Sequence, residues 1–125
     1  MSHWTSIQTE IRDIDALRAA CDELGLTLRE NAQARGYENN TRHGDYVVQL
    51  KGPFDVALTR EQNGNYSLAT DWWDGHVEKE VGTGYGRLLQ LYGVHKASLE
   101  ARKRGLTVQR RLLQNGTINL RLGRV

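Results

Sequence analysis

The stretch YVVQLKGPFDVALTREQNGNYSLAT, residues 46–70, decides the fold because apolar and polar side chains alternate along it. A period of two is typical of strands that bury one face. Gly52-Pro53 and the polar run 62–65 interrupt the alternation, as turns between strands do. The apolar positions are Tyr46, Val48 and Leu50, then Phe54, Val56 and Leu58, then Tyr66, Leu68 and Thr70. The stretch therefore predicts an antiparallel meander.

The residues before this stretch predict a strand, a helix and another strand. Residues 3–11 and 26–29 alternate in polarity. Between them, apolar side chains recur every three or four residues, as on one face of a helix. Asp13 or Asp15 can cap this helix, and Gly25 can end it in a left-handed conformation. Its apolar stripe consists of Ile14, Leu17, Cys21 and Leu24.

Two further segments complete the expected order of elements. Residues 31–44 are polar without a period, so we expect a mobile surface loop or a frayed crossover there. A second helix should begin between His76 and Tyr85 and continue to Gly105. Two strands follow, joined by a turn at residues 114–116 that contains Asn-Gly, the strongest short hairpin signal.

Together these elements predict a single α+β domain over residues 1–125. We expect two layers: an antiparallel sheet of about six or seven strands and two helices packed on one of its faces. The order would be strand, helix, four strands, helix, two strands. A length of 125 residues is enough to enclose one hydrophobic core. No segment resembles a secretory signal or a membrane span, so we expect a cytoplasmic protein without a membrane partner.

The segment GTGYG, residues 82–86, raises the question of a phosphate-binding loop. A Walker loop needs a preceding strand and a Lys-Ser or Lys-Thr after it, but acidic Glu78 and Glu80 precede this segment and Arg87 follows it. The spacing of the glycines does not fit a dinucleotide fingerprint either. We therefore expect Gly82, Gly84 and Gly86 to allow close packing or a kink where the second helix begins.

The sequence indicates no metal site, no cofactor and no catalytic motif. The four histidines lack metal-ligand spacing, and the lone thiol of Cys21 is expected to be buried. His95 lies on the apolar side of the second helix, where it can bond to a neighbour at the edge of the core. If the protein binds a small ligand or is an enzyme of unknown reaction, we expect a pocket at Tyr92, His95 and Lys96.

The pair Trp72-Trp73, between Asp71 and Asp74, predicts a contact surface. At the end of a strand one indole can enter the core while its neighbour points the other way, and exposed indoles beside carboxylates often mark interfaces. The alternative is that both rings wrap around the start of the helix. The candidate protein-interaction surface consists of Trp72, Trp73, Gly82, Gly84, Tyr85 and Gly86.

The charge is unevenly distributed along the chain. Residues 96–125 hold eight Lys or Arg and one acid, a net charge of +7, whereas residues 1–95 hold nine against fourteen, a net charge of −5. A solvated basic edge and a nucleic-acid surface are both consistent with this pattern. Arg110 shares its strand face with apolar residues, so it must pair, extend to solvent or mark a bulge. Candidate nucleic-acid contacts are Arg102, Lys103, Arg104, Arg111, Arg121 and Arg124.

Several motifs resemble one known family. They are Met1-Ser2-His3-Trp4, Arg35-Gly36-Tyr37, Asp71-Trp72, the segment QLYGVHKA at residues 90–97, and Asn115-Gly116-Thr117-Ile118. Over nearly its whole length the chain is similar to the proteins of the domain of unknown function 1257, named after hypothetical chloroplast open reading frame 35. Other members have a plainer helix where this chain has its three alternating glycines.

The resemblance implies a small soluble protein of cyanobacteria, plastids, other bacteria or phages, often encoded near an AAA+ ATPase. It supplies no catalytic residues. We therefore expect a non-enzymatic accessory protein with a protein partner, and an AAA+ ATPase is the candidate. The alternatives are a nucleic-acid-binding domain that uses the basic C-terminal region, and a small-ligand-binding protein or enzyme.

Overall fold

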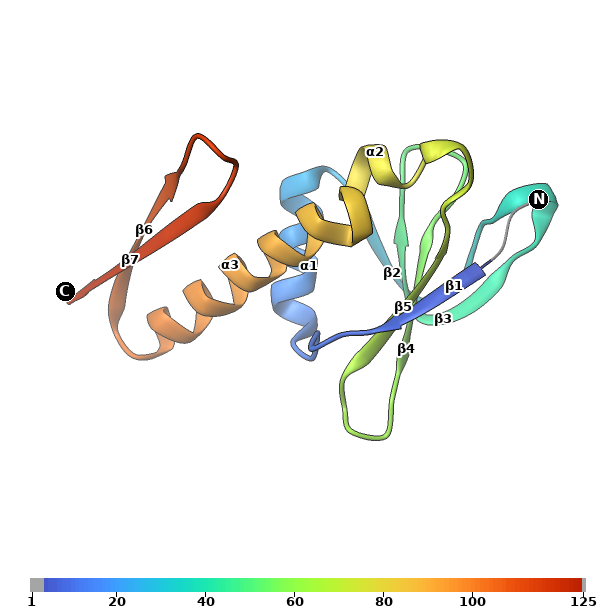
Figure 1. Cartoon of the computed structure of the whole chain (residues 1–125). Helices are drawn as coiled ribbons and strands as arrows, with labels where there is room; N and C mark the ends of the chain where they lie inside the picture. Colours follow the sequence, from blue (N-terminus) through green and yellow to red (C-terminus); the bar gives the residue numbers. More distant parts are fainter. Residues whose placement is uncertain (1–3, 125) are drawn as a thin grey trace.

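The computed structural model describes residues 4–124 and confirms the α+β class and the order of strands and main helices (Figure 1). The first strand covers Trp4–Gln8 and is therefore shorter than the predicted range 3–11, of which residue 3 lies outside the described residues. Short 3-10 turns occur at Tyr37–Asn39, Trp73–Gly75 and Thr83–Tyr85. The elements are β1 Trp4–Gln8, α1 Ile14–Leu24, β2 Thr27–Ala34, β3 Arg42–Gln49, β4 Val56–Arg60, β5 Tyr66–Asp71, α2 Glu78–Val81, α3 Gly86–Lys103, β6 Leu106–Leu112 and β7 Ile118–Arg124.

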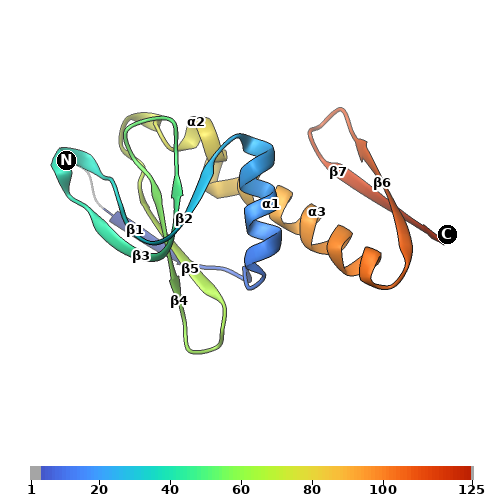
Figure 2. The same cartoon turned by 180° about the vertical axis from the view of Figure 1, so that it is seen from behind.

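The seven strands form two antiparallel sheets rather than one. The larger sheet has the order β1-β5-β4-β3-β2, and β6 and β7 pair only with each other. The cause is the length and direction of α3, which runs outward from the sheet and delivers the chain to β6 at its far end (Figures 1 and 2). The β6–β7 hairpin therefore reaches neither edge of the larger sheet.

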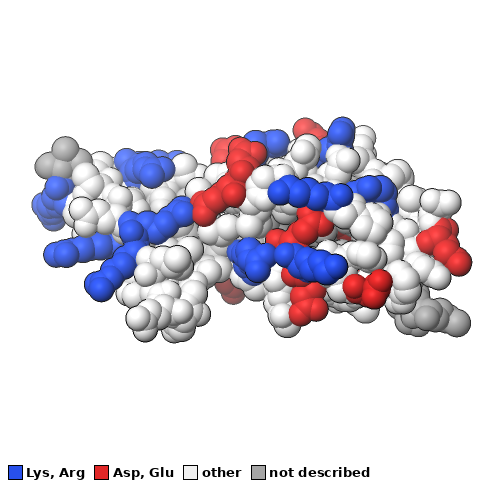
Figure 3. Space-filling view, turned by 90° about the horizontal axis from the view of Figure 1, so that it is seen from above, with Lys and Arg blue, Asp and Glu red and all other residues white. Residues whose placement is uncertain are grey.

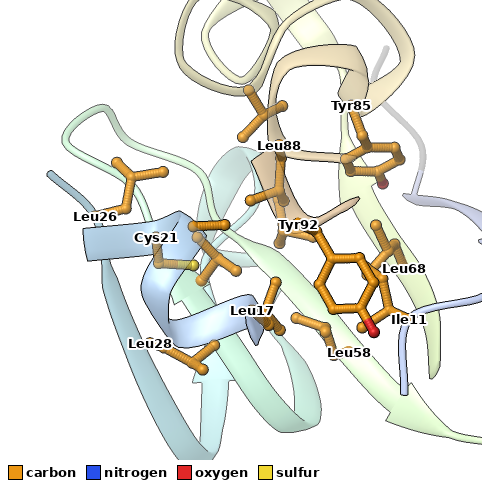
Figure 4. Close-up of a cluster of buried hydrophobic side chains, with 14 of the residues drawn as sticks. Ile11, Leu17, Cys21, Leu26, Leu28, Leu58, Leu68, Tyr85, Leu88 and Tyr92 are labelled. Atoms are coloured by element: carbon orange, nitrogen blue, oxygen red, sulfur yellow. The ribbon is translucent and has the colours of Figure 1, made fainter. Parts of the chain in front are cut away.

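The hydrophobic core lies between α1, α3 and one face of the five-stranded sheet. Leu58 and Leu68 from the sheet meet Leu17, Leu88 and Tyr92 from the helices in one buried cluster (Figure 4). The placement of both helices on one face follows from the alternation, because Val48, Val56, Leu58 and Leu68 are fully buried on that face.

Helix α1 begins and ends at the residues that the sequence predicts. Asp13 caps it by accepting a hydrogen bond from the backbone N–H of Ala16, and Gly25 ends it at φ 73°.

The prediction of a mobile loop at residues 31–44 is wrong. Most of this segment belongs to β2 and β3, which pair from Thr27–Gln49 to Ala34–Arg42. Asn31 has a left-handed backbone (φ 51°), and beyond it Ala32 and Ala34 pack with Val47 and Ala57 on the side away from the main core. The conformation at Asn31 therefore breaks the alternation that identifies other strands.

A buried carboxylate joins the end of β2 to the start of β4. Asp55 accepts hydrogen bonds from the backbone N–H of Arg35 (2.9 Å), its Nε (2.9 Å) and its Nη2 (2.7 Å), and from the N–H of Leu50 (3.0 Å). The hydrogen bonds to Asp55 raise the pKa of Arg35 above its ordinary value. The Arg35-Gly36-Tyr37 motif thus has a structural role.

The glycine segment divides the second predicted helix into α2 and α3. Gly82 has φ 86° and ψ 168°, a conformation reserved almost entirely for glycine. A Cβ at this position would lie 2.7 Å from the backbone nitrogen of Arg87. The structure thus has the expected kink at the start of the helix, with close packing at Gly82; Gly84 contributes a left-handed backbone (φ 57°), whereas Gly86 has an ordinary helical conformation with open space around it and begins α3.

Candidate functional site

The helix layer leaves strand β1 uncovered. Ile7 is the register partner of Leu68, so both face the helices, yet Ile7 is 41% exposed and Leu68 is fully buried. The two helices cover β5 but do not extend over the edge strand β1 beside it. A groove consequently runs between β1 and the flank of α3.

This groove has two adjoining hollows that meet at Ile7. The larger encloses about 670 Å³ and lies beside the middle of α3, and the smaller encloses about 400 Å³ and lies beside the glycine segment. We call both together the β1 groove. Its lining is Ile7, Gln8, Thr9, Glu10, Ile11, Trp72, Glu78, Thr83, Gly84, Tyr85, Leu89, Tyr92, Gly93, Lys96, Ala97 and Glu100.

Several residues of the two predicted surfaces meet in the β1 groove. Trp72, Gly84 and Tyr85 line the smaller hollow, whereas Tyr92 and Lys96 line the larger. The Trp72 ring packs edge-on against Tyr85, with ring centroids 4.7 Å apart. The hydroxyl of Tyr92 accepts hydrogen bonds from the backbone of Arg12 and Asp13, so its side chain is fixed. Gly82 and Gly86 shape the adjoining backbone but do not line the groove.

Tyr85 is the strained residue of this region. It has a left-handed backbone (φ 65°), and its hydroxyl is buried without a hydrogen-bond partner among residues 4–124. Burial raises the pKa of Tyr85 above its ordinary value. Backbone strain and an unsatisfied hydroxyl both cost stability, and such costs cluster at functional positions.

Trp73 lies outside the β1 groove. It is 40% exposed and packs against Tyr37, Phe54 and His76, with ring centroids 4.7, 6.4 and 6.1 Å apart. The two tryptophans therefore diverge, with Trp72 against the core and Trp73 in an aromatic cluster at the end of the sheet. The structure thus divides the predicted interaction surface into two parts.

The predicted pocket at Tyr92, His95 and Lys96 needs a correction, because His95 is not part of it. The Nε2 atom of His95 lies 2.8 Å from Glu23 on α1, and Arg110 of β6 contacts the same carboxylate at 2.9 Å. Burial alone raises the pKa of Glu23, but hydrogen bonds from His95 and Arg110 lower it below its ordinary value. Glu23 therefore links α1, α3 and the C-terminal hairpin, and Arg110 pairs rather than extending to solvent.

The six predicted nucleic-acid contacts are all exposed but do not share one face. Arg102 and Lys103 end α3, and Arg104 follows them. Arg111 and Arg121 lie on the polar face of the hairpin, while Arg124 pairs in register with Leu106 on the other face.

The sequence analysis missed the contribution of β1 and of the small residues on α3. The sequence places Ile7 and Thr9 on a strand, and Gly93 and Ala97 on a helix, but no local pattern indicates that the two segments meet. One signal was available, since residues 4–9 hold no charge. Within residues 4–124 no group of acidic, histidine and cysteine side chains could hold a metal ion, and no helix is long and apolar enough to span a membrane.

These features define the class: an α+β protein whose sheet leaves one uncharged edge open beside an apolar groove. The chain belongs to the protein family of unknown function DUF1257, whose model matches residues 20–121. A relative is the uncharacterized protein ycf35 of Pyropia yezoensis, which is 30% identical over 124 residues that cover 96% of this chain and 94% of the relative. These matches confirm the family resemblance seen in the motifs. No solved structure matches the chain.

Proposed function

We propose that this protein is a non-enzymatic interaction module whose β1 groove binds an extended segment of a partner protein. The observation that carries the proposal is an unpaired, uncharged sheet edge beside an apolar groove. An incoming strand can extend the sheet through backbone hydrogen bonds to β1 and place alternate side chains in the groove.

The two edges of the sheet differ in a way that supports this choice. Among the strands of residues 4–124, β1 pairs only with β5 and β2 only with β3. Edge strand β2 carries Arg29 and Glu30, and charges on an edge discourage unwanted pairing. Edge strand β1 has the sequence WTSIQ and holds no charge of its own, although Arg42 of β3 lies over the Trp4 ring (5.2 Å) and donates a hydrogen bond to Ser6 (3.3 Å). We infer that the edge at β1 is open for a partner.

The residues that line the groove indicate which side chains the bound segment should carry. Ile7, Leu89 and Ala97 favour apolar side chains, and Gly93 has open space where a Cβ would stand, so a partner backbone can approach closely. Lys96 is half-buried and has no ion pair within the described chain, but Glu10, Glu78 and Glu100 line the same groove, so the four charged side chains give its lining a net charge of −2. The segment should therefore alternate apolar residues and carry basic rather than acidic side chains between them.

The partner class that we propose is an AAA+ ATPase, which the family resemblance suggests. In this role the protein is an accessory subunit that holds an extended segment of the ATPase. The proposal for the groove does not depend on that identity, because it rests on the geometry of β1 and α3.

A displayed library of random peptides, selected on the immobilised protein, tests the groove directly. We expect enriched peptides with alternating apolar residues to bind and to slow hydrogen exchange at the amides of β1. Ile7→Arg should weaken binding at least about tenfold, because it removes one apolar contact and places a desolvated charge at the junction of the hollows.

Thr27→Arg is the matched control for this experiment. It adds the same charge to an exposed position of the opposite edge strand, so peptide affinity should stay within about twofold. Equal losses in the two variants, or peptides that protect β2 instead of β1, would contradict the proposed docking site.

A further inference from the structure

The β6–β7 hairpin has two unlike faces. Its register places apolar residues together with Arg110 and Arg124 on one face, and polar residues on the other. The residues of the polar face are Thr107, Gln109, Arg111, Asn119, Arg121 and Gly123. Within this face, Gln109 lies directly opposite Arg121, and Arg111 lies opposite Asn119.

Contacts with the helices determine which face of the hairpin is free. The side chain of Gln90 on α3 accepts a hydrogen bond from the N–H of Ile118 (3.2 Å) and donates one to the carbonyl of Gly116 (3.3 Å). Arg110 reaches Glu23 of α1. Ile118 on the apolar face thus packs against the core, whereas Leu112 and Leu122 on the same face are 70% and 50% exposed. The polar face remains in solvent, where Gln109, Arg111, Asn119 and Arg121 are all exposed.

This end of the molecule is strongly basic. Residues 101–125 contain seven Lys or Arg and no acid. In Figure 3 the hairpin end shows Lys and Arg but no Asp or Glu, whereas the rest of that view shows both signs of charge intermixed (Figure 3). Within residues 4–124, Arg111 and Arg121 have no ion pair, in contrast to Arg110. The field of the protein therefore attracts a polyanion to the hairpin and repels it from the acidic remainder.

We propose that the polar face of the β6–β7 hairpin binds double-stranded DNA in the major groove. Neighbouring strands lie about 4.8 Å apart, and a two-stranded ribbon fits the B-form major groove of about 12 Å. Arg side chains can bond guanine, and Asn and Gln side chains can bond adenine. The four side chains Gln109, Arg111, Asn119 and Arg121 supply these groups from two adjacent cross-strand pairs, and Arg102 and Arg104 at the end of α3 supply charge for phosphates.

The composition of this region selects duplex DNA over other nucleic acids. Residues 93–125 contain no Phe, Trp or Tyr, so they offer no aromatic platform on which single-stranded bases stack. The major groove of double-stranded RNA is too narrow for side chains to read. This inference is independent of the proposed role of the β1 groove, because the two surfaces share no residue.

Fluorescence anisotropy with a labelled DNA duplex of about 20 base pairs, about two helical turns, tests the proposal across a salt series. Arg111→Ala/Arg121→Ala should weaken binding about tenfold or more. Arg102→Ala/Arg104→Ala removes the two proposed phosphate contacts, so the slope of log affinity against log salt should fall by about 1.8. Arg111→Ala/Arg121→Ala should instead lessen the discrimination between duplexes that differ in their guanine positions. The control Arg29→Ala/Arg60→Ala removes the same charge from exposed positions of the larger sheet and should change affinity less than about threefold.

Further arms of the experiment separate the possible partners. The corresponding single strand should bind more weakly than the duplex, and polyglutamate of similar charge should not displace the duplex. The proposal would be overturned by any of four results. These are absence of binding at about 50 mM salt, equal losses of affinity in the hairpin and control double variants, tighter binding of the single strand than of the duplex, and displacement of the duplex by polyglutamate. Far-UV circular dichroism of each variant confirms that the hairpin variants remain folded.

Discussion

The five-stranded part of the molecule and the C-terminal hairpin are built in opposite ways. In the larger sheet Val48, Val56, Leu58 and Leu68 are fully buried, whereas no residue from 102 to 124 is buried. The larger sheet therefore carries the stability of the fold, and the hairpin is held by a few surface contacts. Regions of this second kind open locally at low cost. Substitutions in the larger sheet should therefore change the stability of the whole fold, whereas substitutions in the hairpin should act on the hairpin alone.

The largest expected effect belongs to the buried carboxylate of the larger sheet. Asp55→Ala should lower the free energy of unfolding by about 3 kcal/mol, because it leaves the N–H of Leu50 and the side chain of Arg35 without their partner. Denaturant titration measures this change. Asp45→Ala is the control, since the exposed Asp45 accepts a single hydrogen bond, from the N–H of Arg60, and its loss should cost no more than about 1 kcal/mol. Similar losses of unfolding free energy in Asp55→Ala and Asp45→Ala would contradict the structural role of the buried Asp55 carboxylate.

A smaller effect is expected at the junction of α2 and α3. Gly82→Ala should lower the free energy of unfolding by about 2 kcal/mol, because its backbone conformation suits only glycine and the added Cβ meets Arg87. Gly86→Ala lies at φ −54° with open space around the new atom, so it should leave stability unchanged or raise it by up to about 1 kcal/mol. Thermal and denaturant unfolding measure the stability of both variants. A Gly82→Ala variant as stable as the unchanged protein would show that the fold does not require glycine at this kink.

Stability should depend on pH through the larger sheet and its helices and not through the hairpin, because within the described residues the buried titratable groups all lie outside β6 and β7. Burial raises the pKa of Cys21 from 9.0 to about 12. Below pH 9 the thiol is neutral in both states; above it the unfolded thiol ionises first, so folding loses about 1.4 kcal/mol per pH unit up to about pH 12. Cys21→Ala should reduce the loss of unfolding free energy per pH unit at alkaline pH, as denaturant titrations at several pH values can measure. The loss that remains comes in part from Tyr85, whose pKa is also raised by burial. The same loss per pH unit in Cys21→Ala and in the unchanged protein would contradict a neutral buried thiol.

The smallest effect is expected for the link between the two regions. Arg110→Ala removes the hairpin's pair with Glu23 but leaves the contact between Glu23 and His95, and this partly exposed pair at 2.9 Å should contribute less than about 1 kcal/mol. Hydrogen exchange should show up to about fivefold lower protection in β6 and β7, with β4 and β5 unchanged. Lys103→Ala, which breaks only the exposed pair with Glu100, should leave the hairpin amides as they are. Lower protection throughout the sheet would show that the hairpin does not open separately.

The sequence predicts the parts of the fold that depend on local alternation and capping. The strands at Tyr46, Val56 and Tyr66, the Asp13 cap and the left-handed Gly25 follow from side-chain period and backbone preference. Residues 31–44 escaped prediction because the left-handed Asn31 and the exposed faces of the edge hairpin remove the period of two. The separation of β6 and β7 from the larger sheet depends on the direction of α3, which no local pattern encodes.

The candidate site was predictable only in fragments. Trp72, Tyr85, Tyr92 and Lys96 attract attention as residue types, but their meeting in one groove requires β1 to lie beside α3. That contact joins segments about eighty residues apart and depends on the strand order. The pairing of His95 with Glu23 is equally non-local, and it explains why the expected pocket loses one of its three residues.

The separation of the two surfaces can be measured through the backbone amide chemical shifts of the labelled protein, recorded as duplex DNA and a groove-selected peptide are added in turn. We expect two disjoint sets of shifts: DNA should affect the end of α3, β6 and β7, and the peptide should affect β1, the glycine segment and the first half of α3. Both ligands should bind at once. DNA-induced shifts centred on β1, or displacement of one ligand by the other at a shared surface, would contradict this separation.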